Sequence, residues 1–197
     1  MKRVFDLTSS LAAIVLLSPL LIVFSLLILL TMGWPVFYRQ WRVGRNGRHF
    51  RIIKFRSMVK NADRQGPAVT VGGDPRITRI GKILRKYKFD ELPQLLNVLA
   101  GHMSVVGPRP EVPEYVAFYT DEQKRVLSVR PGLTDPASIV YRDEESILAR
   151  YDDTRTAYVE KIMPAKLRLN PAYLEKATFG GDLALVFTTL KKLFRPR

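Results

Sequence analysis

Two adjacent carboxylates, Asp90 and Glu91, are the residues best suited to chemistry in this chain of 197 residues. They follow a basic segment, residues 76–88, and precede an apolar helical segment, residues 92–99. Asp is a favoured helix N-cap and Pro93 is tolerated in a first turn, so we predict a helix that starts at Asp90. A helix N-terminus favours negative charge, so we expect both carboxylates to be ionised at neutral pH with an anionic ligand nearby.

The simpler interpretation of such a pair is a helix cap followed by a solvated charge. Neighbouring residues cannot share one face of a helix, so any chemical roles of Asp90 and Glu91 must differ. The elements that would surround the pair therefore decide between the two interpretations.

Composition limits the partners and the chemistry of the chain. Lys and Arg number 32 against 18 Asp and Glu, a net charge of +14, which favours phospholipid, phosphorylated substrates or nucleic acid. The absence of cysteine excludes disulfides and thiolate chemistry, and two histidines are too few for a His-rich metal site. The length suits one domain with a modest core.

Residues 7–32 form an apolar stretch without a charged side chain, long enough for a membrane helix. Ser18-Pro19 lies near its centre, where proline removes a backbone hydrogen bond and the serine hydroxyl can satisfy the freed carbonyl. Basic residues flank both ends, and by the positive-inside tendency both ends would face the cytoplasm. The residues alone leave two alternatives open: a re-entrant helical hairpin broken at Ser18-Pro19, or a spanning helix with a proline kink.

The elements after the membrane segment are strongly basic. Residues 36–43 and 48–55 predict a β-hairpin around the turn Gly44-Arg45-Asn46-Gly47, and alternation places Lys54 and Arg56 on the same side. Residues 61–75 are typical of a loop. Residues 77–86 predict a basic amphipathic helix at the membrane interface, and residues 112–128 predict a further amphipathic helix.

Arg109 lies between two prolines in Gly107-Pro108-Arg109-Pro110. Such a segment has little backbone freedom, and a fixed guanidinium suits bidentate recognition of phosphate or carboxylate. The alternative is a proline-rich connector with a solvated arginine.

Four segments carry a resemblance to a known family. They are Lys54-Phe55-Arg56-Ser57-Met58, Asp90-Glu91-Leu92-Pro93-Gln94-Leu95-Leu96-Asn97-Val98-Leu99, Gly107-Pro108-Arg109-Pro110 and Val129-Arg130-Pro131-Gly132-Leu133-Thr134. In these motifs the chain resembles the bacterial sugar transferases, the small monotopic phosphoglycosyl transferases, over nearly its whole length.

The resemblance implies transfer of a sugar 1-phosphate from a UDP-sugar to polyprenyl (undecaprenyl) phosphate through a covalent phosphosugar-aspartate. It implies Mg²⁺ as cofactor, Asp90 as nucleophile and Glu91 as its partner and metal ligand. A carboxylate can attack phosphorus without prior deprotonation, and Mg²⁺ needs only one or two carboxylates besides substrate phosphates. Lys54, Arg85 and Arg109 are the first candidates to neutralise the diphosphate, followed by Arg56, Arg76, Arg79 and Lys82.

The resemblance also favours the re-entrant hairpin, broken at Ser18 and Pro19. It implies an α+β, mainly helical fold: a membrane hairpin over residues 1–34, and a small catalytic domain over residues 35–197 with a β-hairpin and amphipathic interfacial helices. The expected location is the cytoplasmic face of the bacterial inner membrane. Expected partners are the UDP-sugar, undecaprenyl phosphate, anionic membrane lipid and a second copy of the chain, without nucleic acid.

Residues 135–145 depart from the commonest family pattern, and we expect Tyr141 and Arg142 there to select the nucleotide or sugar. The sequence does not identify the sugar. A competing hypothesis is a membrane-anchored basic protein without enzymatic activity that binds acidic lipid or nucleic acid, although this leaves the Asp-Glu pair and the Gly-Pro-Arg-Pro segment unexplained. No helix-turn-helix or zinc spacing supports the nucleic-acid version.

Overall fold

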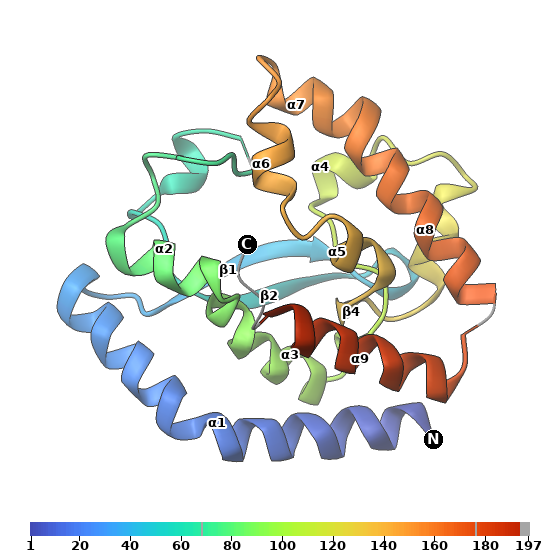
Figure 1. The fold of residues 1–197 in the computed structure, drawn as a ribbon, viewed down its shortest axis with the longest axis horizontal. Coiled ribbons are helices and arrows are strands. Elements are labelled where there is room, and N and C mark those ends of the chain that lie inside the picture. Colours follow the sequence, from blue (N-terminus) through green and yellow to red (C-terminus); the bar gives the residue numbers. More distant parts are fainter. Residues whose placement is uncertain (68, 176, 194–197) are drawn as a thin grey trace.

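A computed structural model describes residues 1–67, 69–175 and 177–193. The fold is mainly helical, with short strands and one long apolar N-terminal helix, as predicted (Figure 1). The helices are α1 (Lys2–Met32), α2 (Arg79–Lys86), α3 (Leu95–Leu99), α4 (Pro113–Val116), α5 (Pro136–Val140), α6 (Glu144–Leu148), α7 (Thr154–Ala157), α8 (Met163–Glu175) and α9 (Phe179–Leu193). The strands are β1 (Phe37–Val43), β2 (His49–Phe55), β3 (Ser104–Val106) and β4 (Gly132–Thr134). Tighter or wider helical turns are η1 (Arg45–Gly47), η2 (Ala62–Arg64), η3 (Phe89–Gln94), η4 (Gln123–Ser128) and η5 (Tyr158–Ile162).

Helix α1 is continuous through Pro19, so the predicted interruption of the helix at Ser18-Pro19 is not present. The helix nevertheless bends between its two halves (Figure 1). Proline at position 19 cannot donate to the carbonyl of Val15, and Ser18 Oγ donates to that carbonyl at 2.8 Å. The serine therefore satisfies the acceptor that proline frees, as the sequence predicted, and this keeps the bent helix intact.

Both ends of α1 are bonded to the rest of the protein. Near the start, Arg3 Nη1 donates to the Val98 carbonyl at 2.8 Å, and the buried Asp6 carboxylate accepts from Ser104 Oγ at 2.9 Å. At the other end, Arg56 Nη2 donates to the carbonyls of Met32 and Gly33 at 2.6 and 2.7 Å. These bonds fix both ends of the apolar helix to one body.

The predicted β-hairpin is confirmed. Strands β1 and β2 pair antiparallel, with Phe37 opposite Phe55 and Val43 opposite His49. Asn46 and Gly47 take left-handed backbone conformations in the turn, with φ of 55° and 74°, which these residue types tolerate better than most. Lys54 stands near the end of β2 and is thereby directed toward the centre of the molecule.

Strands β3 and β4 form a short parallel pair, with Ser104 opposite Gly132 and Val106 opposite Thr134. Where the two segments cross, a Cβ on Gly107 would lie 2.4 Å from the Arg130 carbonyl oxygen, and one on Gly132 would lie 2.1 Å from the Gly107 nitrogen. Only glycine permits this approach. The crossing places the segment around Arg109 beside the start of α5.

The prediction of one amphipathic helix over residues 112–128 is wrong, because α4 ends at Val116 and η4 begins only at Gln123. Between them, the Thr120 N–H donates to Gln123 Oε1 and the Gln123 N–H donates to Thr120 Oγ1, at 2.9 and 3.3 Å. This reciprocal capping box starts a new helical turn and interrupts the apolar pattern. The helix predicted over residues 77–86 is confirmed as α2, with Thr78 as its cap.

Three apolar clusters hold these elements together. Phe24 and Ile28 of α1 pack with Phe55 and Leu84, and so join α1 to β2 and α2. A second cluster, including Ile52 and Val98, joins the hairpin to α3. The third and largest joins α4, η4, α6, α7, η5 and α8. The segment that carries Asp90 and Glu91 lies between the first two clusters.

Candidate active site

Asp90 and Glu91 lie in η3, a turn of 3₁₀ helix that begins at Phe89. The prediction that Asp90 caps this helix is wrong: the cap position is Lys88, in a left-handed conformation with φ of 59°, and no side chain accepts a capping hydrogen bond. Asp90 is therefore already inside the turn, and it lines a cavity.

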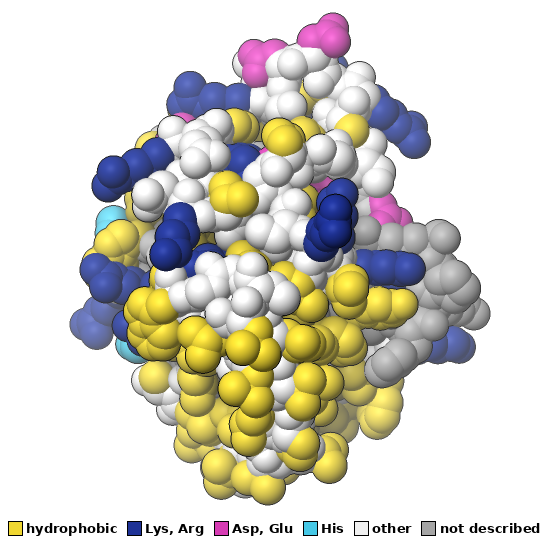
Figure 2. Space-filling model, turned by 90° about the vertical axis from the view of Figure 1, so that its left-hand side faces the viewer, with side chains coloured by type: hydrophobic (Ala, Val, Ile, Leu, Met, Phe, Trp, Pro, Cys, Tyr) yellow, Lys and Arg dark blue, Asp and Glu magenta, His cyan; other side chains and the backbone are white. Residues whose placement is uncertain are grey.

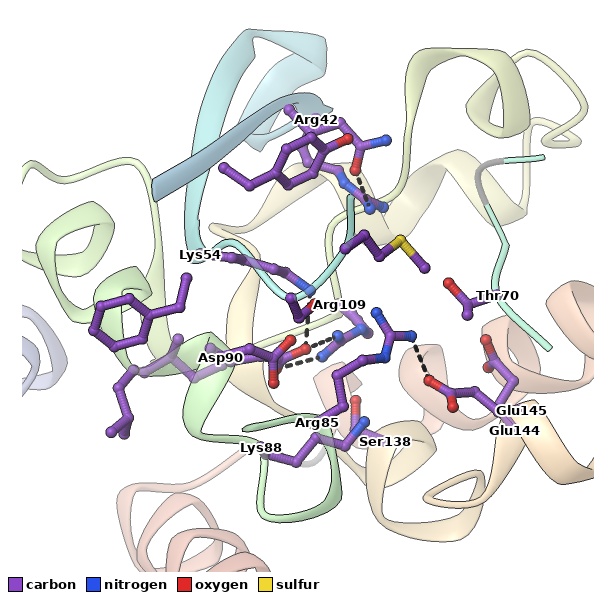
Figure 3. A pocket seen from close by; sticks show the side chains of 18 of the residues that line it. Arg42, Lys54, Thr70, Arg85, Lys88, Asp90, Arg109, Ser138, Glu144 and Glu145 are labelled. Carbon is purple, nitrogen blue, oxygen red and sulfur yellow. Dashed lines mark hydrogen bonds and ion pairs between the residues drawn. The ribbon is translucent and has the colours of Figure 1, made fainter. Parts of the chain in front are cut away.

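The pair lines a cavity of ≈ 1180 Å³. Its walls come from β2, η3, α2, the Arg109 segment, the loop around residues 59–70, α5, α6 and α8, with contributions from α1 and α9. Figure 3 shows Asp90, Lys54 and Arg109 together on one side and Glu144 and Glu145 on the other. Sites for ligands of moderate size commonly have volumes of about 300–1,000 Å³, so this cavity can hold a large polar ligand.

Glu91 is held by two cations. Arg109 contacts both of its oxygens, through Nη2 to Oε1 and through Nη1 to Oε2 at 3.2 Å, and Lys54 Nζ donates to Oε1 at 3.0 Å. Burial alone would raise the pKa of Glu91, but the charges of Arg109 and Lys54 outweigh it and hold that pKa well below its usual range. Glu91 is thus ionised, as predicted.

Asp90 is in the opposite situation. It is 5% exposed, and its Oδ1 has no hydrogen-bond partner among the described residues. Burial, and then the neighbouring charge of Glu91, raise the pKa of Asp90, while Lys54, Arg85 and Lys88 lower it in part. The expectation that the helix N-terminus stabilises this carboxylate is therefore not met, and a buried carboxylate oxygen remains available.

Asn97 positions Lys54 indirectly, through hydrogen bonds to the neighbouring backbone of β2. The Asn97 side chain accepts from the Ile53 N–H at 2.9 Å and donates to the Arg51 carbonyl at 2.8 Å, so it pairs with β2 as another strand would. This fixes β2 against η3 and α3. The sequence analysis gave Asn97 no role. The signal in the sequence was a polar residue inside an otherwise apolar stripe, and the structure shows that this residue is only 2% exposed.

Arg109 is positioned by Asp135, a fully buried residue that sequence reasoning did not select. Asp135 Oδ2 accepts from the Arg109 N–H at 3.3 Å, and Oδ1 accepts from the Ser138 N–H at 2.7 Å as the cap of α5. One carboxylate thereby ties the Arg109 segment to α5. Asp135 opens the stretch that departs from the family pattern.

The other predicted phosphate-binding arginines differ in position. Arg85 reaches into the cavity and pairs with Glu145 of α6 (Figure 3). Arg76 lines the cavity, but Asp74 and the carbonyls of Ala62 and Pro67 bind its guanidinium, which anchors the loop.

Two further arginines that we predicted to bind the diphosphate differ in position: Arg56 lines the cavity and Arg79 does not. Arg56 directs Nη2 to the end of α1, although its other guanidinium nitrogens have no partner among the described residues. Arg79 is exposed and does not line the cavity, so its position does not support phosphate binding. Tyr141 and Arg142 do line it, at the junction of α5 and α6.

The residues present fit a Mg²⁺ ion only together with a substrate. No group of three or more His, Cys, Asp or Glu that could hold a metal occurs among the described residues. Asp90 Oδ1 has no partner, and Glu91 uses three of its roughly four lone-pair positions on Lys54 and Arg109. Mg²⁺ is typically held by one or two carboxylates plus substrate phosphates, which matches this sparse set.

Known proteins resemble the chain along its whole length. The family model for bacterial sugar transferases matches residues 1–196. The UDP-N-acetylgalactosamine-undecaprenyl-phosphate N-acetylgalactosaminephosphotransferase of Aeromonas hydrophila is 37% identical over 98% of this chain and 43% of its own length. The exopolysaccharide production protein ExoY of Sinorhizobium fredii is 35% identical over 96% of this chain and 83% of its own.

A third relative, the exopolysaccharide production protein PSS of Rhizobium leguminosarum bv. phaseoli, is 56% identical over 71% of this chain and 73% of its own. The chain thus spans less than half of the Aeromonas protein and most of the two rhizobial ones. The chain belongs to the bacterial sugar transferase family.

Proposed function

We propose that this protein transfers a sugar 1-phosphate from a UDP-sugar to undecaprenyl phosphate through a covalent intermediate on Asp90. The observation that carries the proposal is the buried Asp90 carboxylate, which lines a cavity together with Lys54, Arg85, Lys88 and Arg109. Its Oδ1 has no partner within the described part of the chain. The Aeromonas relative, named as a UDP-N-acetylgalactosamine-undecaprenyl-phosphate N-acetylgalactosaminephosphotransferase, supports the substrates.

In the first step an Asp90 oxygen forms a bond to the phosphorus that carries the sugar. The bond from this phosphorus to the bridging oxygen breaks, and its electron pair leaves with UMP. Arg85, Lys88 and Arg109 offset the charge that develops on the leaving phosphate, while Arg109 and Lys54 hold Glu91 in place. Glu91, with its remaining lone pair, would hold Mg²⁺ together with the substrate phosphates, and the ion would supply charge neutralisation there.

In the second step a phosphate oxygen of undecaprenyl phosphate attacks the same phosphorus. The bond to Asp90 breaks, the carboxylate is regenerated, and the product is a polyprenyl diphosphate sugar. Splitting one displacement into two in this way requires an ionised nucleophile with a free oxygen. Asp90 has such an oxygen, because its Oδ1 has no partner among the described residues, whereas Lys54 and Arg109 bind the oxygens of Glu91. The raised pKa of Asp90 means that this carboxylate must lose its proton before it attacks.

The lipid acceptor would reach the site from the membrane side. The cavity is lined there by residues of α1, including Ser9, Ala13 and Leu17. Leu16 and Leu30 of α1 are about four-fifths exposed, and Figure 2 shows hydrophobic side chains over the lower part of the molecule with Lys and Arg above them. An apolar surface with a basic border suits a membrane with anionic lipids.

We further propose that α1 is re-entrant. A straight helix of 31 residues would be about 46 Å long and would carry its ends to opposite sides of a hydrocarbon core of about 30 Å. Both ends are instead bonded to one domain, through Arg3 and Asp6 at the start and Arg56 at the end. This supports an entry and exit on the cytoplasmic face.

Topology is tested in the natural cysteine-free background. Single cysteines at Lys2 and Arg45 should both resist a membrane-impermeant maleimide in intact cells and both react in inverted vesicles. Labelling of the two positions from opposite sides would show that α1 spans the membrane.

The reaction is tested by UMP release from UDP-sugars with Mg²⁺ and undecaprenyl phosphate. Without acceptor, the wild-type protein should gain the mass of one sugar phosphate, located on the peptide with Asp90. Asp90→Asn should abolish the adduct, while Asp121→Asn, a substitution on the exposed surface, should leave it unchanged. Full turnover by Asp90→Asn would show that another group is the nucleophile and would return the non-enzymatic lipid-binding hypothesis to consideration.

A further inference from the structure

The wall of the cavity away from Asp90 carries a charged cluster without a role in the proposed phosphoryl transfer. Glu111, Glu144, Tyr158 and Lys166 line the cavity, and we call them the acidic wall. Lys166 Nζ lies 2.6 Å from Glu144 Oε2 and 3.8 Å from Glu111 Oε1, and the Tyr158 hydroxyl donates to Glu111. Figure 3 shows Glu144 across the cavity from Asp90.

Several elements bring this wall together. Glu144 opens α6, Lys166 lies on α8, and Tyr158 begins η5, a π-helical turn of a kind that often occurs at functional sites. Lys166 is 8% exposed, whereas the Glu144 side chain is 25% exposed. Glu144 is therefore the member of the wall that presents most of its surface to a ligand.

The chemistry of the wall excludes the phosphates of a donor and suits a neutral polar group. Two carboxylates repel phosphate, and the cations that would bind it, Lys54, Lys88 and Arg109, are on the other side. Carboxylates accept hydrogen bonds from hydroxyl groups. Burial, and then Glu111, raise the pKa of Tyr158 well above its usual value, so its hydroxyl stays neutral.

A second polar group in the same cavity lacks a partner. Ser138 Oγ is buried without a hydrogen bond among the described residues, and Figure 3 shows it lining the cavity below Arg109. Asp90 Oδ1 is likewise unpartnered. Buried polar groups are normally hydrogen-bonded, so these atoms indicate that a polar ligand completes the site.

We propose that Glu144, held in place by Lys166, binds hydroxyl groups of the transferred sugar and thereby selects the donor. This rests on the proposed function. The transferred sugar is bonded directly to the phosphorus that Asp90 would attack, whereas the ribose is one phosphate further away. Glu111 follows Arg109 by two residues, and Glu111 and Glu144 line the same cavity as Asp90, so a sugar on the attacked phosphorus would extend across the cavity toward the wall.

The experiment compares wild type, Glu144→Gln and a control, Glu160→Gln, which is exposed and outside the cavity. Rates of UMP release are measured with UDP-glucose, UDP-galactose and their N-acetylated counterparts. We expect Glu144→Gln to change the ratio of kcat/KM between the best donor and its C4 epimer by about 10-fold or more, the usual effect of a charged hydrogen bond. The control should keep the wild-type ratio.

The ratio is informative because partial unfolding lowers both kcat/KM values by the same factor. The double variant Glu144→Gln with Lys166→Met removes the charge pair as a unit and avoids a buried unpaired lysine. We expect it to regain stability but keep the altered ratio. Restoration of the wild-type ratio in the double variant would show that Glu144 acts only through its pair with Lys166, and would overturn the proposal.

Two other outcomes would also overturn it. An unchanged ratio in Glu144→Gln, with an active wild-type protein, would remove Glu144 from sugar selection and leave the proposed function intact. UMP carries the ribose but no transferred sugar, so weaker inhibition by UMP in Glu144→Gln would assign the residue to the ribose instead. Absence of UMP release by the wild-type protein from every donor would overturn both proposals.

Discussion

Asp90 and Glu91 are neighbours in the chain but occupy opposite environments. Glu91 is contacted by Arg109 and Lys54, and these charges hold its pKa well below the usual range. Asp90 has an oxygen without a partner among the described residues, and burial raises its pKa. The difference arises because Glu91 lies between Lys54 of β2 and Arg109, which both bind it, whereas Asp90 lines the cavity.

This contrast distinguishes Glu91, a carboxylate held by ion pairs, from Asp90, a carboxylate with a free oxygen. An ion pair that is already satisfied contributes to the order of the site, and Glu91 uses three of its roughly four lone-pair positions in this way. A buried carboxylate without a partner costs folding free energy and is retained where a ligand or a reaction uses it. Each of the following predictions tests one side of this contrast.

The largest expected effect is on turnover in Asp90→Asn. Asparagine keeps the shape of the side chain but cannot form the phosphosugar bond, so kcat should fall by about 10⁴-fold or more. Because the folded-state pKa of Asp90 is raised, ionising it costs stability above its unfolded-state pKa, and Asn avoids this cost. The melting temperature in detergent should therefore stay the same or rise. A clearly lower melting temperature would mean that Asp90 is a structural residue.

Glu91→Gln should instead destabilise the protein. The variant leaves Lys54 and Arg109 without their shared anion, and because this cluster is only partly buried the loss should be about 3 kcal/mol at most. For a chain of this size that corresponds to a fall of roughly 10 °C or less in melting temperature. Differential scanning fluorimetry of Glu91→Gln beside Asp90→Asn checks this. Equal melting temperatures for the two variants would remove the distinction between the carboxylates.

The pH dependence should follow Asp90. Its raised pKa means that kcat/KM should fall as the pH drops through a value above the ordinary 3.8 of aspartate, because the protonated acid cannot attack phosphorus. Lys88 lowers that pKa, so Lys88→Gln should move the acid limb of the profile to higher pH. Lys86→Gln, an exposed neighbour, should leave it in place. A shift to lower pH in Lys88→Gln would contradict this electrostatic account.

The smallest effect is expected at Arg79. It is exposed on α2 and does not line the cavity, so Arg79→Ala should change kcat/KM by less than about threefold at physiological ionic strength, where exposed charges are screened. Arg85→Ala, one turn and a half further along α2 and inside the cavity, should reduce it far more. Equal losses of kcat/KM in the two variants would mean that basic charge near the site matters more than whether the side chain lines the cavity.

Much of the fold follows from local sequence patterns. The turn Asn46-Gly47 specifies the hairpin, and the apolar spacing with Thr78 as cap specifies α2. Local competition explains where the predictions fail. The Thr120–Gln123 capping box interrupts an otherwise helical pattern, and Lys88 takes the cap position that Asp90 was expected to fill.

Part of the candidate site could be predicted and part could not. Motifs located Asp90, Glu91, Lys54 and Arg109, and the basic helix predicted over residues 77–86 supplied Arg85; all five line the cavity. The motifs could not show that the Arg76 guanidinium is bound by Asp74. Nor could they show that Asn97 and Asp135 position the site, because these interactions depend on partners that only folding brings together. Glu111, Glu144 and Lys166 come from three separate segments and share no sequence pattern.

The sequence by itself determined the chemistry that is available: two adjacent carboxylates, a basic surround, a proline-fixed arginine and an apolar helix with proline at its centre. Residue types, spacing and backbone restriction are local properties, so they can be read without coordinates. The tertiary structure decided which carboxylate is neutralised, because that depends on the approach of Lys54 and Arg109 across the fold. It also decided that Asp90 is buried with its Oδ1 unpartnered among the described residues, since burial and electrostatic environment are properties of the whole packed chain.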